Sequence, residues 1–546
     1  MPRISGALQH ARSSPFGRPG WRRWAVFALL AWLLAFCTAP VRTGQEVTVR
    51  ILADGQTHTV TLPSGQTVAQ ALERAGIERN DLDRIEPPGY TLVRDGMTVR
   101  VIRIEENFVQ EEEIIPFERR TLRNEALPEG EIRLVQRGVN GLKRVTYRIL
   151  REDGKETARQ VVKVEVVKEA VPEIVMVGVR QPFLAQPIPG RLAYLAGGNA
   201  WVMDGNTGAR RPVVLTGDLD GRVFRLSLDG RWLLFSRKGQ EEGPINTLWV
   251  VDLEAAEPQP LPLPAENVVH FAGFGPIQQW LIAYSTVEPR PGPPGWQANN
   301  DLRFLPLREE GPGKPRVVVE THAGGIYGWW GTTYRWHPRG RTLAYARPDQ
   351  VGTVDVRKGV LEPWLTFVPY RAQGDWAWVP GVAWAPTGDV LFTVLHGNPE
   401  EPVEEEDPVF HLVALAPGYW TGPLMLAEHT GMFAYPVTSP LRTLPTGEQA
   451  YWVAYLQALF PHQSDTSRYR LMVMDRDGSN KRALFPEEGA PGLAPQEVRW
   501  SPGPLDEKGQ WAIALIYQGN LYLVQVPTGK PLQLTTDALV TALDWR

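Results

Sequence analysis

A pair of alternating sequence patterns runs through the last two-thirds of the chain. The first is an apolar strand, a turn and a second apolar strand, as in VFRLSLDGRWLLFS (223–236) and TYRWHPRGRTLAYA (333–346). The second is a single strand that ends in a turn, as in NAWVMDGNTG (199–208), and it occurs seven times. Such repetition constrains the fold strongly, because each unit can bury its apolar face only against its neighbours.

The spacing of the repeats predicts a ring of small sheets. Units of about 48 to 60 residues suit four short strands each, which are the blades of a β-propeller. The first unit begins at RLAYLAGGNAWVMD (191–204) without its first strand, and VTALDWR (540–546) supplies a strand of that type with nothing after it. We therefore predict a seven-bladed propeller over residues 191–546, closed by residues 540–546 so that no strand edge is exposed.

Residues 1–41 are typical of an export signal or a membrane anchor. Five arginines and no acidic residue precede an uncharged apolar run of 18 residues at 24–41. An uncleaved anchor, a cleaved signal and a lipoprotein anchored at Cys37 all remain open, although Phe36 departs from the small residue that a lipoprotein signal requires before its cysteine. The protein is thus predicted to be extracytoplasmic, at the cell surface, and either anchored through this segment or secreted.

Charge and cysteine content exclude some functions. Cys37 is the only cysteine, so the exported part has no disulfide and no thiolate metal site. The net charge of −4 becomes −9 when the five arginines of the signal are left out, as −4 − 5 = −9. Because this charge disfavours polyanions, nucleic acid is not an expected partner.

Residues 46–104 predict a small β-grasp domain. EVTVRILADGQTHTVTL (46–62) reads as two strands joined across Asp54 and Gly55, and a short helix follows, capped by Thr67 and ended by Gly76. A second hairpin is expected in YTLVRDGMTVRVIRI (90–104). This is the element order of a ubiquitin-like unit.

Residues 105–180 predict strands that carry unusual glycines. Alternation in residues 145–149 indicates a half-buried strand, and Asp153 with Gly154 predicts a hairpin turn. Gly138 and Gly141 stand just before this strand, where glycine lowers stability and therefore needs a structural reason. Residues 181–190 are a proline-rich linker.

The glycine-marked segment resembles the five-glycine (G-five) domain of bacterial surface proteins. The residues that carry the resemblance are EIIPF (113–117), Gly138, Gly141, Gly154 and VPEIVMVG (171–178). The resemblance implies two thin sheets in which glycines allow tight crossings. It also implies a role in adhesion or polymer assembly at the cell wall, with N-acetylglucosamine-containing glycan as partner.

The flanking regions resemble known domains as well. Residues 46–104 resemble the ubiquitin-like domain that often precedes G-five domains in secreted cell-wall proteins. Residues 191–546 are similar to TolB-like and WD-type propellers, whose W-S-P-D-G signature is represented by Trp500-Ser501-Pro502 and by Ser227-Leu228-Asp229-Gly230. The predicted fold class is mainly β: a β-grasp domain, a G-five sheet module and a seven-bladed propeller.

Motifs for catalysis and cofactors are not found in the sequence. It has no G-x-S-x-G, H-E-x-x-H or phosphate-loop pattern, so we expect neither an enzyme nor a cofactor. DRDGSN (475–480) has the spacing of half a calcium loop, but a hairpin turn is the favoured interpretation, and no metal site is predicted. The acidic stretch EEPVEEED (400–407) is interpreted as a solvated loop, with cation binding left open.

Aromatic residues in two adjacent repeats are the candidate ligand-binding residues. Trp336 and Trp384 occupy the repeated strand position and are expected in the core. The aromatic residues outside that position are expected to form a platform at the propeller mouth, since indole faces stack on sugar rings; they are Tyr327, Trp329, Trp330, Trp376 and Trp378. The alternative is that they fill gaps between blades.

The sequence as a whole predicts a non-enzymatic binding protein of the bacterial cell envelope. The G-five module would associate with cell-wall glycan, and the propeller would be the recognition head. One alternative is an enzyme that acts on glycans, which paired carboxylates across the central pocket would favour. Another is a scaffold for envelope proteins, which a flat exposed patch would favour.

Overall fold

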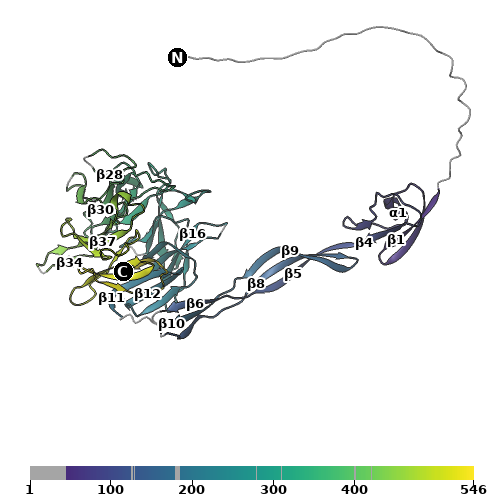
Figure 1. Ribbon diagram of the computed structural model, residues 1–546, viewed down its shortest axis with the longest axis horizontal. Coiled ribbons are helices and arrows are strands. Elements are labelled where there is room, and N and C mark those ends of the chain that lie inside the picture. The colour runs from purple at the N-terminus through teal and green to yellow at the C-terminus, as the bar shows by residue number, and fades with distance from the viewer. Residues whose placement is uncertain are drawn as a thin grey trace, which may run out of the picture. The chain divides into compact units, whose positions relative to one another are not determined.

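The structure of the protein, a computed structural model, describes residues 45–124, 127, 129–178, 185–240, 242–277, 280–308, 310–398, 401–419, 421–444 and 446–546. The predicted signal or anchor lies outside the described residues. Among the described residues, no helix has the length and apolar character needed to cross a membrane. The chain divides into two compact units, each taken by itself: residues up to 118 with 138–172, and residues 119–137 with 173–546 (Figure 1).

The first unit contains the ubiquitin-like domain. Its elements are β1 (Glu46–Ala53), β2 (Gln56–Pro63), α1 (Val68–Arg74), β3 (Arg84–Glu86) and β4 (Thr98–Ile102). They form a sheet of order β2-β1-β4-β3, in which β4 runs parallel to β1. Thr67 caps α1 in a capping box with Gln70. The predicted hairpin over 90–104 is wrong, because β4 pairs with β1 and with β3, and the residues before Gly96 form no strand.

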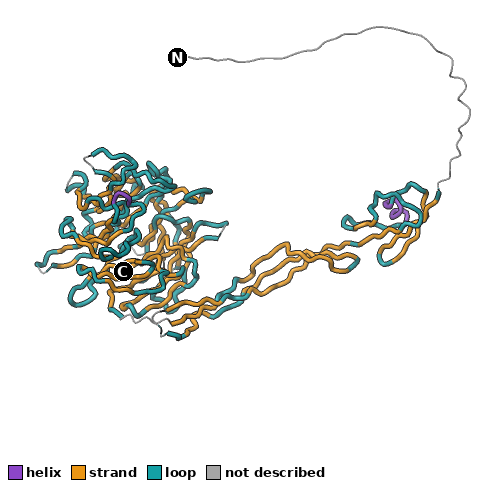
Figure 2. The backbone as a smooth tube through the Cα atoms, viewed as in Figure 1, coloured by secondary structure: helices purple, strands orange, loops and turns teal. Residues whose placement is uncertain are grey.

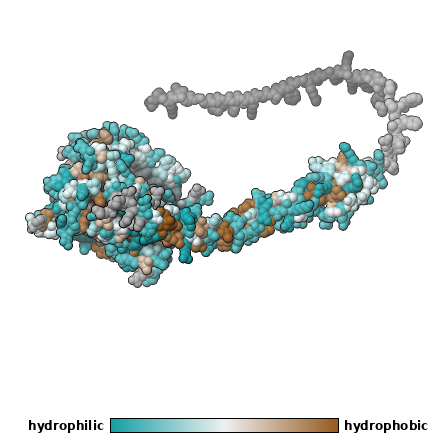
Figure 3. All heavy atoms as spheres, turned by 60° about the horizontal axis from the view of Figure 1, so that its bottom comes forward, coloured by the Kyte–Doolittle hydropathy of each residue, from teal (hydrophilic) through white to brown (hydrophobic). Residues whose placement is uncertain are grey.

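The same unit contains a three-stranded sheet of order β5-β8-β9. Its strands are β5 (Ile104–Ile115), β8 (Gly141–Glu152) and β9 (Lys155–Lys168), and the predicted turn at Asp153 and Gly154 joins β8 to β9. Val145 and Ile149 of β8 are buried, whereas all 14 residues of β9 are exposed, including its valines. The alternation of β9 therefore buries no face, and the visible face of this part shows apolar side chains among hydrophilic ones (Figure 3).

Close packing explains the glycines in this sheet. A Cβ atom on Gly138 would lie 2.3 Å from the ring of Phe117, and one on Gly141 would lie 2.5 Å from the carbonyl oxygen of Lys168. Any side chain at these two positions would overlap its neighbours. The expectation that glycines permit tight crossings is confirmed at both positions.

The second unit contains a small sheet and a propeller, whose strands are joined by many loops and turns (Figure 2). The small sheet has the order β6-β10-β7, from β6 (Arg119–Asn124), β10 (Glu173–Gly178) and β7 (Ile132–Gln136). Met176 of β10 packs into the same buried cluster as Leu192 and Trp545 of the propeller. This small sheet therefore shares a hydrophobic core with the propeller.

The described residues of the propeller form seven sheets, which confirms the predicted number of blades. The strands of each blade are given from the innermost outward. The first blade consists of β43 (Val540–Trp545), β11 (Pro187–Ala196), β12 (Asn199–Asn206) and β13 (Arg210–Val214), and the second of β14 (Leu219–Leu226), β15 (Trp232–Lys238), β16 (Asn246–Asp252) and β17 (Leu261–Glu266). The third consists of β18 (Ala272–Phe274), β19 (Leu281–Tyr284) and β22 (Leu302–Arg308), with β23 (Gly311–Pro312) and β24 (Arg316–Val319) both paired with β22, and the fourth of β25 (Thr333–Trp336), β26 (Leu343–Arg347), β27 (Gln350–Asp355) and β28 (Val360–Thr366).

The remaining three blades follow the same order. They are β29 (Val382–Trp384), β30 (Leu391–His396), β31 (Phe410–Leu415) and β32 (Leu424–Ala427); β33 (Val437–Thr438), β36 (Trp452–Ala458), β37 (Tyr469–Asp475) and β38 (Arg482–Phe485); and β39 (Arg499–Trp500), β40 (Trp511–Tyr517), β41 (Asn520–Val526) and β42 (Pro531–Gln533). The third and sixth blades also carry the hairpins β20 (Val287–Pro289) to β21 (Trp296–Ala298) and β34 (Arg442–Thr443) to β35 (Gln449–Ala450), and a short 3-10 helix, Pro461–Gln463, precedes β37.

The ring closes as predicted. Strand β43, from the end of the chain, pairs antiparallel with β11, so the first blade is built from both ends of the propeller sequence. The indole nitrogen of Trp545 donates a 2.8 Å hydrogen bond to the carbonyl oxygen of Pro189, and Trp545 is 2% exposed. The apolar clusters lie between neighbouring blades, so each blade depends on the next.

Removing the Trp545 side chain from the closing strand β43 should therefore destabilise the propeller. We expect Trp545→Ala to lower its unfolding free energy by about 3–5 kcal/mol, because it removes a buried indole and leaves a cavity. Chemical denaturation followed by tryptophan fluorescence measures this change. Leu539→Ala is the control, since Leu539 is 54% exposed just before β43; equal effects of the two substitutions would contradict the role of the closing strand.

The glycine crossing in the first unit gives a second prediction. Gly141→Ala should destabilise the β5-β8-β9 sheet by about 1–3 kcal/mol, because the new methyl group must displace backbone atoms. Faster amide hydrogen exchange in β8 would report this loss. Gly89→Ala should leave exchange unchanged, since its nearest neighbour would be 3.6 Å away.

Candidate functional site

The innermost strands of the seven blades surround a central channel. A cavity of about 640 Å³ opens there, lined by residues from β14, β18, β25, β29, β33, β39 and β43 or directly next to them. Alternation along each strand sends one side chain into the channel and the next between blades. Phe224 and Leu226, for example, lie in the core between the first two blades, and Arg225 between them lines the channel.

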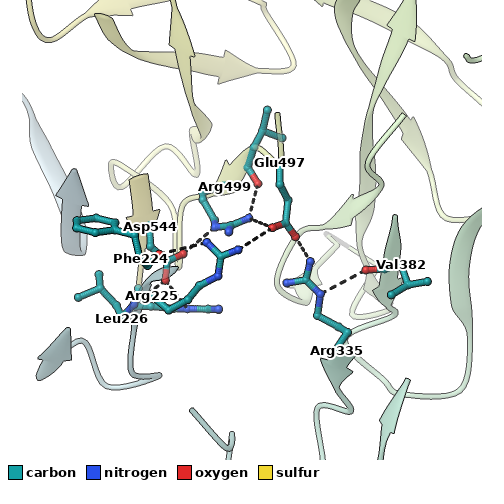
Figure 4. A network of polar contacts seen from close by, with 10 residues as sticks. Phe224, Arg225, Leu226, Arg335, Val382, Glu497, Arg499 and Asp544 are labelled. Atoms are coloured by element: carbon teal, nitrogen blue, oxygen red, sulfur yellow. Dashed lines mark hydrogen bonds and ion pairs between the residues drawn. The ribbon is translucent and has the colours of Figure 1, made fainter. Parts of the chain in front are cut away.

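Three arginines and two carboxylates meet in this channel (Figure 4). Arg225 comes from the second blade, Arg335 from the fourth and Arg499 from the seventh. Each of them immediately precedes the residue at the repeated aromatic position, as Asp544 does in the first blade. The same register therefore brings residues 274 positions apart in sequence, Arg225 and Arg499, into one cluster.

Hydrogen bonds and ion pairs join the cluster. Arg499 donates to Asp544 through Nε over 2.7 Å and pairs with Glu497 through Nη1 over 2.9 Å. Arg225 donates to Glu497 over 3.4 Å, and Arg335 pairs with the same carboxylate. Glu497 is thus shared by three guanidinium groups, and these five side chains carry one more positive than negative charge.

Burial in the channel destabilises the charged forms of Arg225 and Arg335. The side chains of Arg225 and Arg335 are 35% and 36% exposed, yet protein surrounds both. Burial lowers the pKa of each to about 9, and repulsion from Arg499 adds to this effect. Both groups remain charged at neutral pH and are only partly neutralised by Glu497.

Asp544 is held in its ionised form. Its side chain has no exposed surface, and burial alone would raise its pKa. The positive charges of Arg546, Arg499 and Arg225 outweigh burial and lower the pKa of Asp544, and the backbone N–H of Leu226 contributes by donating a 2.7 Å hydrogen bond. Asp544 therefore fixes Arg499 and the second blade in place.

A second cavity of about 220 Å³ adjoins the first. The two share Arg335, Glu497 and His270 in their linings, and Trp330 and Tyr435 complete the wall of the smaller one. Burial lowers the pKa of His270 to about 4, so this imidazole is neutral at physiological pH. The smaller cavity thus joins an aromatic wall to the arginine cluster.

The predicted aromatic residues fall in different places. Trp330 lines the smaller cavity and contacts the ring of Trp329 at 5.8 Å between centroids. The hydroxyl of Tyr327 donates a 2.6 Å hydrogen bond to Glu405, in the acidic stretch, and half-buried Trp376 lies 6.3 Å from the ring of Phe433.

Trp378 offers no surface to a ligand. It is 1% exposed, packs against Phe410 and donates a hydrogen bond to the carbonyl oxygen of Met432. Trp378 is therefore a core residue, in agreement with the alternative that these aromatic residues fill gaps between blades. Trp384 is buried as expected, whereas Trp336 is only half-buried.

Sequence reasoning missed the arginine cluster. The signal was present in four blades, in the residue before the repeated aromatic or apolar position, which is occupied by Arg225, Arg335, Arg499 and Asp544. Aligning the inner strands by that position would have gathered them. The hairpin β20–β21 was also missed; its Trp296 contacts Trp330 at 5.6 Å between ring centroids.

Comparison with family models identifies the domains of the N-terminal part. Residues 106–180 match the model of the G5 domain, and residues 49–89 match that of the G5-linked ubiquitin-like domain. The chain contains a G5 domain. The G5 match covers strands of both three-stranded sheets. G5 domains are typical of extracellular surface proteins.

Solved structures resemble separate parts of the chain. The G5 domain of IgA1 protease is 26% identical, covering 15% of this chain and 94% of that chain, with a TM-score of 0.12. The periplasmic gluconolactonase of Pseudomonas aeruginosa is 12% identical, covering 66% of this chain and 99% of that chain, with a TM-score of 0.41. Tricorn protease is 12% identical, covering 75% of this chain and 44% of that chain, with a TM-score of 0.37. A search of curated proteins gave no match.

Ionisation of Asp544 should contribute to stability in a pH-dependent way. Its lowered pKa means that the charge stabilises the folded state above the ordinary value of 3.8, and that this contribution is lost as the pH falls below that value. We expect Asp544→Asn to cost about 3–5 kcal/mol at pH 6, and the difference from wild type to shrink between about pH 5 and pH 3.

Urea denaturation across this pH range measures the difference. Glu507→Gln, in an exposed turn between β39 and β40, is the matched control and should follow the wild-type curve. A constant difference between Asp544→Asn and wild type at all pH values would contradict the assignment.

Proposed function

We propose that this protein is a non-enzymatic binding protein of the bacterial cell envelope whose propeller binds an anionic ligand in its central channel. The single observation that carries the proposal is the shared carboxylate: Glu497 serves three guanidinium groups. A carboxylate or phosphate on a ligand would supply the missing negative charge. Planar guanidinium groups suit such partners because they donate two parallel hydrogen bonds.

The size of the channel supports a small ligand or the end of a larger one. A cavity of about 640 Å³ lies within the usual range for small-molecule sites. A propeller used only as a scaffold would need an exposed flat patch and no charged cavity. The aromatic wall at Trp330 gives a sugar ring a surface on which to stack.

The state of the carboxylates favours binding over glycoside cleavage. An acid catalyst needs a carboxyl group that keeps its proton near neutral pH, which requires a raised pKa. The pKa of Asp544 is lowered instead, and its side chain is fully buried. Glu497 is held by three arginines, so neither carboxylate is placed to donate a proton to a leaving group.

The N-terminal domains support a location at the cell wall. The G5 domain would associate with wall glycan containing N-acetylglucosamine, and the segment 1–41 would export the protein or tether it to the membrane. In addition to Trp330, the residues Tyr327, Trp329 and Trp376 remain candidate sugar contacts. Envelope proteins are the alternative partners.

An acidic sugar and its neutral counterpart test the channel. We expect the full-length protein to bind D-galacturonate at least tenfold more tightly than D-galactose, because the carboxylate meets Arg225 and Arg335. Arg335→Gln should weaken galacturonate binding about tenfold or more, which corresponds to the 1.5–3 kcal/mol of a charged hydrogen bond. Isothermal titration calorimetry measures these affinities.

Arg290→Gln is the matched control. Arg290 lies in the β20–β21 turn, pairs with Glu288 at the surface and lines neither channel cavity. Equal galacturonate binding by wild type and Arg335→Gln would contradict the channel site. Conversion of the sugar to a product, followed by mass spectrometry, would favour the enzyme instead.

A further inference from the structure

A basic groove lies on the propeller between the third and fourth blades. It has a volume of about 600 Å³, and its lining includes four cationic residues. They are Lys314, Arg316, Arg339 and Arg341. Among the described residues that line this groove, none is acidic, and none of the four cations forms an ion pair with a described carboxylate. The groove is therefore strongly positive on a protein whose net charge is negative.

The groove also has an aromatic wall. Phe304 and Trp336 stack there with 5.4 Å between ring centroids and an angle of 27° between ring planes. The guanidinium group of Arg316 lies 5.5 Å from the centre of the Phe304 ring. Stacked rings beside cations suit a ligand that has both apolar ring faces and negative groups.

One hydrogen-bond donor in this wall is unused. The indole nitrogen of Trp336 is buried and has no partner among the described residues. At the same repeat position, Trp384 donates to the carbonyl oxygen of Arg335 over 3.3 Å, and Trp500 donates to that of Val437 over 3.2 Å. A buried donor without a partner costs stability, which sets Trp336 apart from Trp384 and Trp500.

The groove adjoins the central channel. Pro276 and Trp336 line both the groove and the larger channel cavity. Two separate sets of cations, one in the channel and one in the groove, therefore lie in adjoining cavities. A single small anion could occupy only one of them, whereas a chain with repeated negative groups could reach both.

We propose that the ligand is a linear saccharide chain with acidic groups on its units, whose terminal unit enters the channel while the next units lie in the groove. This inference rests on the proposed function, because it uses the channel as the terminal subsite. Sugar rings stack on half-buried Trp336, and acidic groups meet Arg339 and Arg341. In this proposal, the channel selects a saccharide with an acidic terminal unit, and the groove favours longer chains.

Affinity as a function of chain length tests the groove. Oligogalacturonides of one to six units are titrated into the full-length protein by isothermal titration calorimetry. We expect the hexamer to bind at least tenfold more tightly than the monomer. The double variant Arg339→Gln, Arg341→Gln should lose most of this gain and keep the monomer affinity of the wild type. Cellohexaose, a neutral chain of the same length, should bind at least tenfold more weakly than the acidic hexamer.

A matched double variant controls for the loss of two positive charges. Lys481→Gln with Arg482→Gln removes two exposed cations of the sixth blade, which line none of the three cavities described, and should leave hexamer affinity unchanged. The single variant Trp336→Phe, which replaces the indole with a smaller ring, should weaken hexamer binding about threefold or more.

The two proposals fail separately in this experiment. Hexamer affinity unchanged by the Arg339, Arg341 double variant, or no gain with chain length, overturns the groove. Hexamer affinity unchanged by Arg335→Gln, with a gain that still depends on Arg339 and Arg341, overturns the channel subsite and leaves the groove as an anion site of its own. Absence of binding by every oligogalacturonide overturns both.

Discussion

The pairing of β43 with β11 is the contact on which the propeller depends. It joins the two ends of the propeller sequence into one sheet, and it also places Asp544 in the inner ring beside Arg499. One strand thus closes the fold and anchors the charged cluster. The cluster cannot form in an open ring, because Asp544 would no longer lie next to the second and seventh blades.

Periodicity was enough to predict the architecture. Apolar alternation at a regular spacing fixed the number of blades, and the strands of the second pattern, such as β12, β27 and β41, are each the third strand from the axis. The hairpin wrongly predicted at 90–104 shows where local signals fail. Asp95 and Gly96 form a tight turn, but β4 finds partners from distant segments, β1 and β3, which no local pattern reveals.

The candidate site was predicted less well, for a physical reason. Tryptophans stand out in a sequence, but their function depends on burial, and burial is a property of the packed fold. Trp330 faces a cavity and Trp378 is sealed under Phe410, although both belong to aromatic stretches of similar composition. The arginines drew no attention because they are spread over three blades, and only the ring brings them together.

Net charge was likewise a poor guide to local charge. Residues 42–546 are negative overall, which disfavours polyanions at long range, yet the channel and the groove between the third and fourth blades are positive. At physiological salt, charges farther apart than about 8 Å are largely screened, so a ligand in the channel responds mainly to the arginines around it. A negative net charge with two positive sites would oppose nonspecific binding of polyanions while still accepting acidic groups in the channel and in the groove.

The innermost strands of the other blades indicate that the arginines are not required for folding. At the position that Arg225, Arg335 and Arg499 occupy in their blades, the third blade has Gly273 and the fifth has Ala383. The fold therefore accepts small uncharged residues at this position. Clustering three cations around one glutamate is unfavourable by itself, as their lowered pKa values at Arg225 and Arg335 indicate. The excess positive charge at Arg225 and Arg335, which burial disfavours, is best explained by a ligand that would neutralise it.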